Sequence, residues 1–214
     1  MSKAVAILDE AGDSALTFRA LAARIGGGVG SIYWYVSSKD ELLDKAADFV
    51  MDGVLADTRE FSSDDPIDDL RHIAIALFET VVDRPWLGSY FMRNVATQPN
   101  SMRFYELVGQ HVLRLGMPPT ESFYAASAVV GFVIGTASDL GQEPPEELVT
   151  GQTTREEFFA RTVAQWNELD PDEWPFLHTI LDVFEGHDDT EQFKAGLDLI
   201  LTGLRLQAES LGGS

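Results

Sequence analysis

Cysteine is absent from this sequence, which excludes disulfide cross-links and thiolate metal sites. Basic residues are scarce, since 15 Lys and Arg stand against 35 Asp and Glu, giving a formal net charge of −20. The four histidines do not share a metal-ligand spacing such as His-x-x-x-His. The longest apolar stretch, around residues 125–137, is interrupted by Gly and Ser and is too short to span a bilayer. We therefore expect a cytoplasmic protein without a metal, a cofactor or a membrane segment.

Apolar residues make up 45% of the 214 residues, enough for a substantial core. No stretch combines alternating apolar and polar residues with turn dipeptides, so strands are not required. Apolar spacing, caps and breakers instead predict an all-α chain. The predicted helices cover residues 4–11, 17–24, 29–36, 38–58, 66–83, 86–97, 100–115, 120–140, 154–168, 174–185 and 190–210.

Residues 16–43 have the layout of a helix-turn-helix motif. A short helix begins after Thr17, three glycines form the turn at 26–28, and a second short helix covers 29–36. The second helix of such a motif enters the DNA major groove. Residues 1–45 carry five basic and six acidic groups, whereas the remainder carries 10 basic and 29 acidic groups. The charge distribution therefore permits contact with DNA only through the N-terminal end.

The 29–36 helix begins with small residues, which let the backbone approach phosphates, and continues with aromatic residues that can reach base edges. Three consecutive aromatic residues point about 100° apart on a helix, so a thin three-helix unit cannot bury all of them. Arg19 suits bidentate recognition of guanine, and Thr17 and Lys39 suit phosphate oxygens. The predicted DNA-binding residues are Thr17, Arg19, Val29, Gly30, Ser31, Tyr33, Trp34, Tyr35 and Lys39.

The same stretch resembles the DNA-binding domain of the tetracycline-repressor (TetR) family. The resemblance lies in Ala20-Leu-Ala, Gly26, Ile32-Tyr-Trp, and Lys39 before Glu41-Leu-Leu. Residues 192–207 resemble the last helix of the branch closest to the tetracycline repressors themselves. The resemblance implies a helix-turn-helix DNA-binding domain at 1–45 and an effector-binding and dimerisation domain at 46–214. It implies a transcriptional regulator, usually a repressor, that binds a palindromic operator as a homodimer and is released by a small-molecule effector.

A pocket and a dimer interface in the larger domain are also implied by the resemblance. Aromatic residues are dense between 66 and 159, which is compatible with an apolar pocket, although each of them alone also suits an ordinary core. The candidate pocket residues are Phe78, Trp86, Phe91, Phe104, His111 and Phe132. Small residues in 123–140 allow close approach of helices, and 191–207 carries a seam at 3–4 spacing. The candidate interface residues are Gly131, Gly135, Ala195, Leu199, Thr202 and Leu206.

Two alternatives stay open. The net charge of −20 and the lone Lys3 near the first helix favour a helical ligand-binding dimer that does not bind an operator. The run Asp64-Asp-Pro-Ile-Asp68 matches the Asp-Asp-x-x-Asp pattern with which all-α isoprenoid synthases hold magnesium. A plainer account is that Asp65 caps a helix that begins at Pro66. No nucleophile–base pattern or phosphate-cradling loop occurs elsewhere, so we expect no enzyme.

Overall fold

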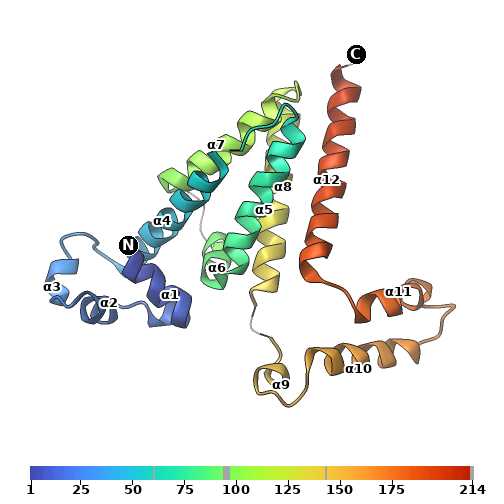
Figure 1. Ribbon diagram of the computed structural model, residues 1–214, viewed down its shortest axis with the longest axis horizontal. Helices are drawn as coiled ribbons and strands as arrows, with labels where there is room; N and C mark the ends of the chain where they lie inside the picture. Colours follow the sequence, from blue (N-terminus) through green and yellow to red (C-terminus); the bar gives the residue numbers. More distant parts are fainter. Residues whose placement is uncertain (60, 94–96, 143, 213–214) are drawn as a thin grey trace. The chain divides into compact units, whose positions relative to one another are not determined.

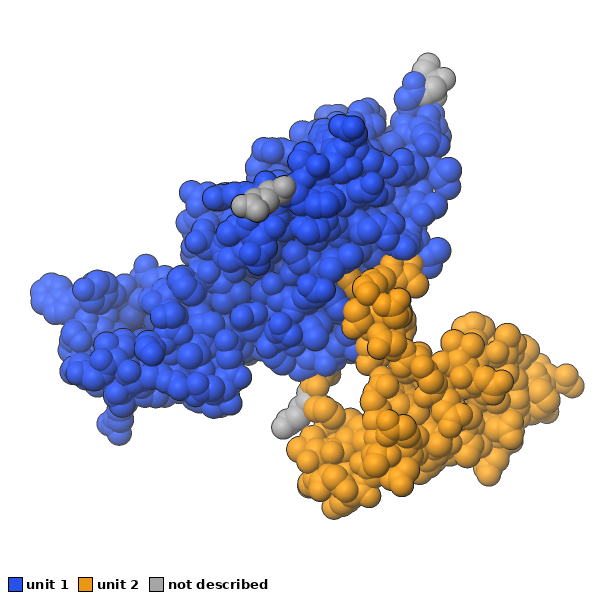
Figure 2. All heavy atoms as spheres, in the orientation of Figure 1, with its two compact units in different colours: residues 1–141, 196–214 blue, residues 142–195 orange. Residues whose placement is uncertain are grey.

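A computed structural model describes residues 1–59, 61–93, 97–142 and 144–212. These residues form twelve α-helices and no strand (Figure 1), which confirms the all-α prediction. The chain divides into two compact units, residues 1–141 with 196–214 and residues 142–195, coloured separately in Figure 2. The helices are α1 Ser2–Ala15, α2 Phe18–Ile25, α3 Val29–Ile32, α4 Lys39–Arg59, α5 Pro66–Val82, α6 Pro85–Arg93, α7 Pro99–Leu113, α8 Pro119–Leu140, α9 Glu146–Val149, α10 Arg155–Asn167, α11 Pro175–Glu185 and α12 Asp189–Gly212.

The head of the first unit consists of α1 to α3 and the start of α4. Thr17 caps α2 as predicted, because its hydroxyl accepts a hydrogen bond from the Ala20 amide at 3.0 Å. Gly26 then ends α2 with a φ of 77°, in the left-handed region that glycine occupies without strain. Leu16 and Leu21 are buried, whereas Ile25, which follows Leu21 at the same helical spacing of about one turn, is 58% exposed. It lies at the end of α2 and lines an open cleft beside the start of α1.

The prediction of one helix over residues 29–36 is wrong in length. Regular α-helix ends at Ile32, and the chain continues as a turn in which the Tyr35 amide donates to the Ile32 carbonyl. The aromatic and β-branched residues at 33–36 lose side-chain freedom in a helix, which favours its early end. The next helix, α4, has a cap of its own: the Ser38 hydroxyl accepts from the Glu41 amide, and the Glu41 carboxylate accepts from the Ser37 amide.

The body of the first unit is built on α4 to α8, with α4 running from the head into the body (Figure 1). Gly88 of α6 lies against α8 so closely that a Cβ there would be 2.8 Å from the Ser138 hydroxyl. By length and composition α8 is apolar enough to cross a membrane, more so than the sequence analysis allowed. Because α8 packs against α5, α6 and α7, this is weak evidence for a membrane span.

The second unit contains α9, α10 and α11, which have no fully buried side chain. A capping box between Thr154 and Glu157 begins α10. The Phe184 ring of α11 contacts α10 through Phe159 and Trp166, with ring centroids 5.3 and 4.4 Å apart. Aromatic contacts therefore join α10 to α11, and an ion pair between Arg161 and Glu147 joins α10 to α9.

Candidate nucleic-acid interface and body cavity

The aromatic residues that follow α3 point away from the core of the head. Trp34 is 88% exposed, Tyr35 77% and Tyr33 59%, and the Tyr33 ring makes an edge contact with Phe18 at a centroid distance of 4.7 Å. On either side of them Ile32 and Val36 are buried and hold the segment in place. The head thus presents indole and phenol groups whose N–H and O–H donors suit phosphate oxygens and base edges.

The remaining predicted DNA-binding residues lie on the same head. Val29, Gly30 and Ser31 form α3, and the Ser31 hydroxyl is occupied by a hydrogen bond to the Gly28 carbonyl at 2.6 Å. Arg19 is exposed on the first turn of α2, next to the cap Thr17. Lys39 differs from the expectation, because its ammonium group already has a protein partner in Asp13.

Three polar contacts join the head to α6. The Trp86 indole donates to Asp9 at 2.7 Å, the Arg93 guanidinium donates to Asp13 at 3.2 Å, and the Tyr90 hydroxyl donates to Asp44 at 2.7 Å. Burial, followed by the bond to Asp44, raises the pKa of Tyr90 far above its ordinary value. None of these contacts was predicted from the sequence. A partial signal was the one-turn spacing of Trp86, Tyr90 and Arg93, which places polar groups on one face of a helix.

A cavity of about 380 Å³ lies in the body among α4 to α8. Its lining is mostly apolar and includes Phe91 and Phe104 of the predicted pocket residues. Ser101 is a polar exception: it is buried, and its hydroxyl has no hydrogen-bond partner among the described residues. Glu106, an exposed residue, is the charged group of the lining. The full lining is Met51, Leu77, Phe91, Ser101, Met102, Phe104, Tyr105, Glu106, Val130 and Ile134.

The other four predicted pocket residues lie outside this lining. Phe78 and Trp86 are buried in the core, and Trp86 is bonded to Asp9. The Phe132 ring lies where α8 meets α12, since a Cβ on Gly196 would approach it to 2.6 Å. His111 shares α7 with Phe104, but its ring lies beside Asp69. One helix cannot aim every side chain at one cavity, because successive residues rotate by about 100°.

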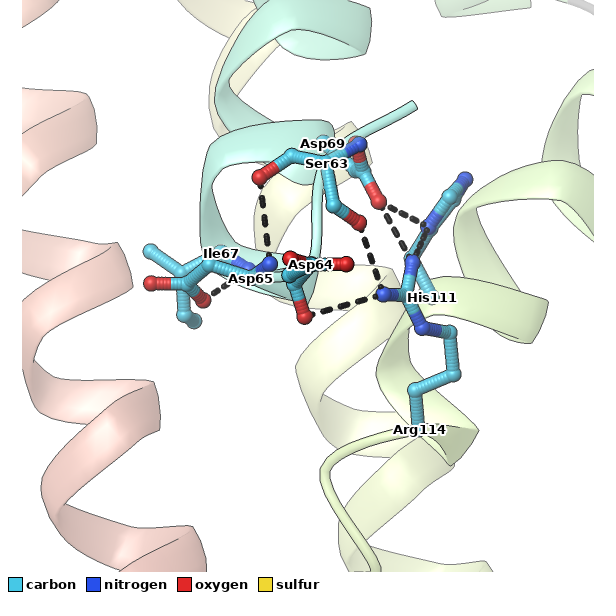
Figure 3. A network of polar contacts seen from close by, with 7 residues as sticks. All are labelled: Ser63, Asp64, Asp65, Ile67, Asp69, His111 and Arg114. Carbon is cyan, nitrogen blue, oxygen red and sulfur yellow. Dashed lines mark hydrogen bonds and ion pairs between the residues drawn. The ribbon is translucent and has the colours of Figure 1, made fainter. Parts of the chain in front are cut away.

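The aspartates after residue 63 form a structural network (Figure 3). The Asp65 carboxylate accepts from the Arg205 guanidinium at 2.5 Å and from the Ile67 amide at 2.9 Å, and these bonds, Arg205 first, lower its pKa. Asp69 is almost fully buried and contacts His111 and Arg114 of the α7 end. Within the described parts of the chain, no group of three or more His, Cys, Asp or Glu residues is arranged to hold a metal ion. The magnesium-dependent alternative through Asp64, Asp65 and Asp68 is therefore not taken further.

The predicted interface residues lie on exposed faces of α8 and α12. Leu199 is 77% exposed and Leu206 is 60% exposed. Ala195, one turn before Leu199, and Thr202, between the two leucines, are also exposed. A Cβ on Gly131 or Gly135 would meet no atom within 4 Å. The opposite face of α12 is buried through Leu197 and Leu201. Each helix thus has one face packed in its own chain and one apolar or small-residue face without such packing.

Comparison with known families agrees with this architecture. The family described as "Bacterial regulatory proteins, tetR family" matches residues 1–46, and "Tetracyclin repressor-like, C-terminal domain" matches residues 62–208. The chain belongs to the TetR family of transcriptional regulators, whose members bind DNA through a helix-turn-helix and are not enzymes. Dimerisation and ligand binding are typical of the family.

Individual relatives support the same assignment. An HTH-type transcriptional regulator of Saccharopolyspora erythraea is 31% identical over 140 residues, which cover 64% of this chain but only 58% of the relative. The repressor DrrR1 of Streptomyces coeruleorubidus is 28% identical over 205 residues, 95% of this chain and 74% of that protein.

Among solved structures, the TetR regulator SCO7222 of Streptomyces coelicolor has a TM-score of 0.81 at 34% identity, covering 96% of this chain and 95% of that one. ActR of the same organism, in complex with actinorhodin, has a TM-score of 0.79 at 23% identity, covering 97% and 95%. At that identity the likeness to ActR shows the fold alone.

Proposed function

We propose that this protein is a repressor whose head binds operator DNA through the segment from Val29 to Tyr35. The observation that carries the proposal is the exposure of Trp34, at 88%, beside two exposed tyrosines, while Ile32 and Val36 of the same segment are buried. Large aromatic side chains left in water on a small domain favour a recognition surface. Arg19 would contact a guanine, and Thr17 and Lys39 would contact phosphates.

The repressor would act as a homodimer in the cytoplasm. Leu199, Leu206 and the open glycines of α8 form uncovered faces that suit a four-helix interface between two copies. Two heads related by a twofold axis would contact adjacent major grooves about 34–36 Å apart, and so a palindromic operator. The repressor DrrR1, which matches 95% of this chain, supports the direction of regulation.

A small-molecule effector would occupy the body cavity. The cavity is of suitable size and is largely apolar, and the Ser101 hydroxyl, which has no hydrogen-bond partner in the described part of the chain, offers a polar contact to a ligand. ActR, which has the same fold, is solved with the small molecule actinorhodin. An effector releases DNA only if it binds better to the arrangement of heads that does not fit the operator. α4 and α6 are the candidate levers, because both line the cavity and both contact the head.

DNA binding is tested by selecting duplexes from a random pool and measuring their affinity by fluorescence anisotropy. The substitution Arg19→Ala should cost about 1–3 kcal/mol and relax the preference at one base position. If the unmodified protein retains no duplex at low salt, the alternative of a ligand-binding dimer without operator binding is favoured instead.

The effector site is tested with the dye anilinonaphthalene sulfonate, whose fluorescence rises in apolar cavities. Val130→Phe adds volume to the cavity lining and should weaken dye binding, because the cavity holds only about 380 Å³. Val149→Phe is the matched control, since Val149 is 61% exposed in the second unit. Equal dye binding by both variants would place the dye elsewhere.

A further inference from the structure

The carboxylate of Asp13 is shared by two cations from different parts of the first unit. Lys39 Nζ lies 2.9 Å from Asp13 Oδ1, and Arg93 Nη2 lies 3.2 Å from Asp13 Oδ2. Lys39 also donates to the Asp13 backbone carbonyl at 2.7 Å. These contacts, Lys39 first, hold the pKa of Asp13 below its ordinary value, so it is charged at neutral pH. One negative charge is therefore divided between the first turn of α4 and the last turn of α6.

A break in α1 makes this arrangement possible. Gly12 has a φ of 71° and a ψ of −177°, which interrupts the helix one residue before Asp13. A left-handed φ of this kind is available to glycine at little cost. The Asp13 carbonyl therefore does not continue the α1 ladder but accepts from the Leu16 amide at 3.1 Å and from Lys39. Both carboxylate oxygens of Asp13 and its backbone carbonyl oxygen can therefore contact cations.

Lys39 is one of the residues proposed above to contact a phosphate, and it lies at the start of α4, a few residues after the exposed aromatic segment. An ammonium group that neutralises Asp13 contributes little attraction to DNA, because the pair is close to neutral. For Lys39 to take a phosphate, it has to leave Asp13 or share its charge. DNA and Asp13 are therefore competitors for the same cation.

Arg93 connects this competition to the body. It ends α6, whose Phe91 lines the body cavity and whose Trp86 and Tyr90 bond to the head. The more closely Arg93 approaches Asp13, the less negative charge is left to hold Lys39. A shift of α6 that withdraws Arg93 would strengthen the hold of Asp13 on Lys39 and weaken DNA binding.

We propose that Asp13 is a positioning residue that withholds Lys39 from DNA phosphate, and that Arg93 sets the strength of this hold. The inference rests on the proposed binding of DNA by the head. In this proposal the Asp13 carboxylate regulates the DNA-binding site. The position of helix α6, which lines the cavity, determines through Asp13 whether Lys39 contacts a phosphate in each head.

The test is a set of duplex affinities measured with the full chain across a series of salt concentrations. D13N should tighten binding to every sequence by about 2- to 5-fold per head, the range that exposed ion pairs support. R93Q should weaken binding by a similar factor and should have no effect when combined with D13N. K39A should lower the slope of log affinity against log salt by about one per head, and should cancel the effect of D13N.

D40N is the matched control, because Asp40 is an exposed acid on the first turn of α4 and its loss changes the charge equally. Its effect should be smaller than that of D13N and should persist with K39A. The inference is overturned if D13N leaves affinity unchanged or lowers it, or if D13N tightens binding as much with K39A as without it. R93Q changes a side chain that is 57% exposed and so tests the idea even if D13N unfolds. Failure of the unmodified protein to bind any duplex would instead contradict the proposed function itself.

Discussion

Arg114 Nη1 donates to the Asp69 carboxylate at 2.5 Å, and the two residues together fasten the α4–α5 link to the end of α7. The second guanidinium nitrogen of Arg114 donates to the carbonyl oxygens of Ser63 and Asp64 at 2.9 and 3.2 Å. The Ser63 amide in turn donates to Asp69 at 2.7 Å. Figure 3 shows the Arg114 and His111 side chains of the α7 end beside the start of α5. The backbone of Ser63 and Asp64 is therefore bonded to side chains of both α5 and the α7 end.

Removing the cation from this network should be costly. The Asp69 side chain is 1% exposed, so Arg114→Met leaves a buried carboxylate without its strongest partner. We expect the free energy of unfolding, measured by urea denaturation, to fall by about 3 kcal/mol. The matched control is Arg155→Met, which breaks an ion pair to Asp189 whose members are 48% and 38% exposed. That variant should lose at most about 1 kcal/mol. Equal losses of unfolding free energy in the two variants would show that the burial of Asp69 does not determine the cost of removing its partner.

The same network should make stability depend on pH through His111. Burial lowers the pKa of His111 below its ordinary 6.5, against the attraction of Asp69, and the Arg114 charge lowers it further. Well above pH 6.5 the His111 ring is neutral in both the folded and the unfolded protein. As the pH falls from there toward the folded-state pKa, the unfolded chain binds the extra proton and stability is lost. The melting temperature, measured by circular dichroism, should therefore decrease less over this pH range in His111→Gln than in the unmodified protein. A wild-type and a variant curve that run parallel would contradict this.

Substitution of the exposed Trp34 should affect DNA binding without affecting the stability of the fold. Because Trp34 is 88% exposed, Trp34→Ala should change the free energy of unfolding by less than about 0.5 kcal/mol. The same variant should lose affinity for the selected duplex in an anisotropy titration. Ile32→Ala is the contrasting control, since Ile32 is 6% exposed and its truncation should cost about 2–5 kcal/mol. A Trp34 variant that binds DNA as tightly as the unmodified protein would remove this side chain from the interface.

The proposed dimer depends on the uncovered face of α12. Leu199→Asp places a charge where the side chain is 77% exposed in one chain, so the monomer fold should tolerate it. Buried between two copies, the unpaired carboxylate would be strongly unfavourable, and sedimentation velocity should show monomers. Leu113→Asp, at a residue of α7 that is 60% exposed, is the control and should leave the oligomeric state unchanged. Dissociation by both variants would point to a general effect of charge.

Local patterns predicted the head well because its signals act over a few residues. The Thr17 cap and the Gly26 turn follow from hydrogen bonds and backbone freedom within one helical turn. The predicted helix after Gly28 was too long, because the aromatic and β-branched residues that follow Ile32 favour a helix only weakly. The local pattern also did not indicate which of the six candidate pocket residues line the cavity described above. Their helices were expected correctly, but rotation about a helix axis is set by neighbours that are distant in sequence.

The linear order of residues by itself determined the all-α class, the exposed aromatic segment and the family, because apolar spacing and short motifs carry that information. Folding in three dimensions decided that Lys39 meets Asp13, that Asp69 is enclosed by Arg114 and His111, and that α6 contacts both the head and the cavity. Those pairings join residues 26 to 77 positions apart. Such contacts depend on how helices pack, which no local spacing specifies.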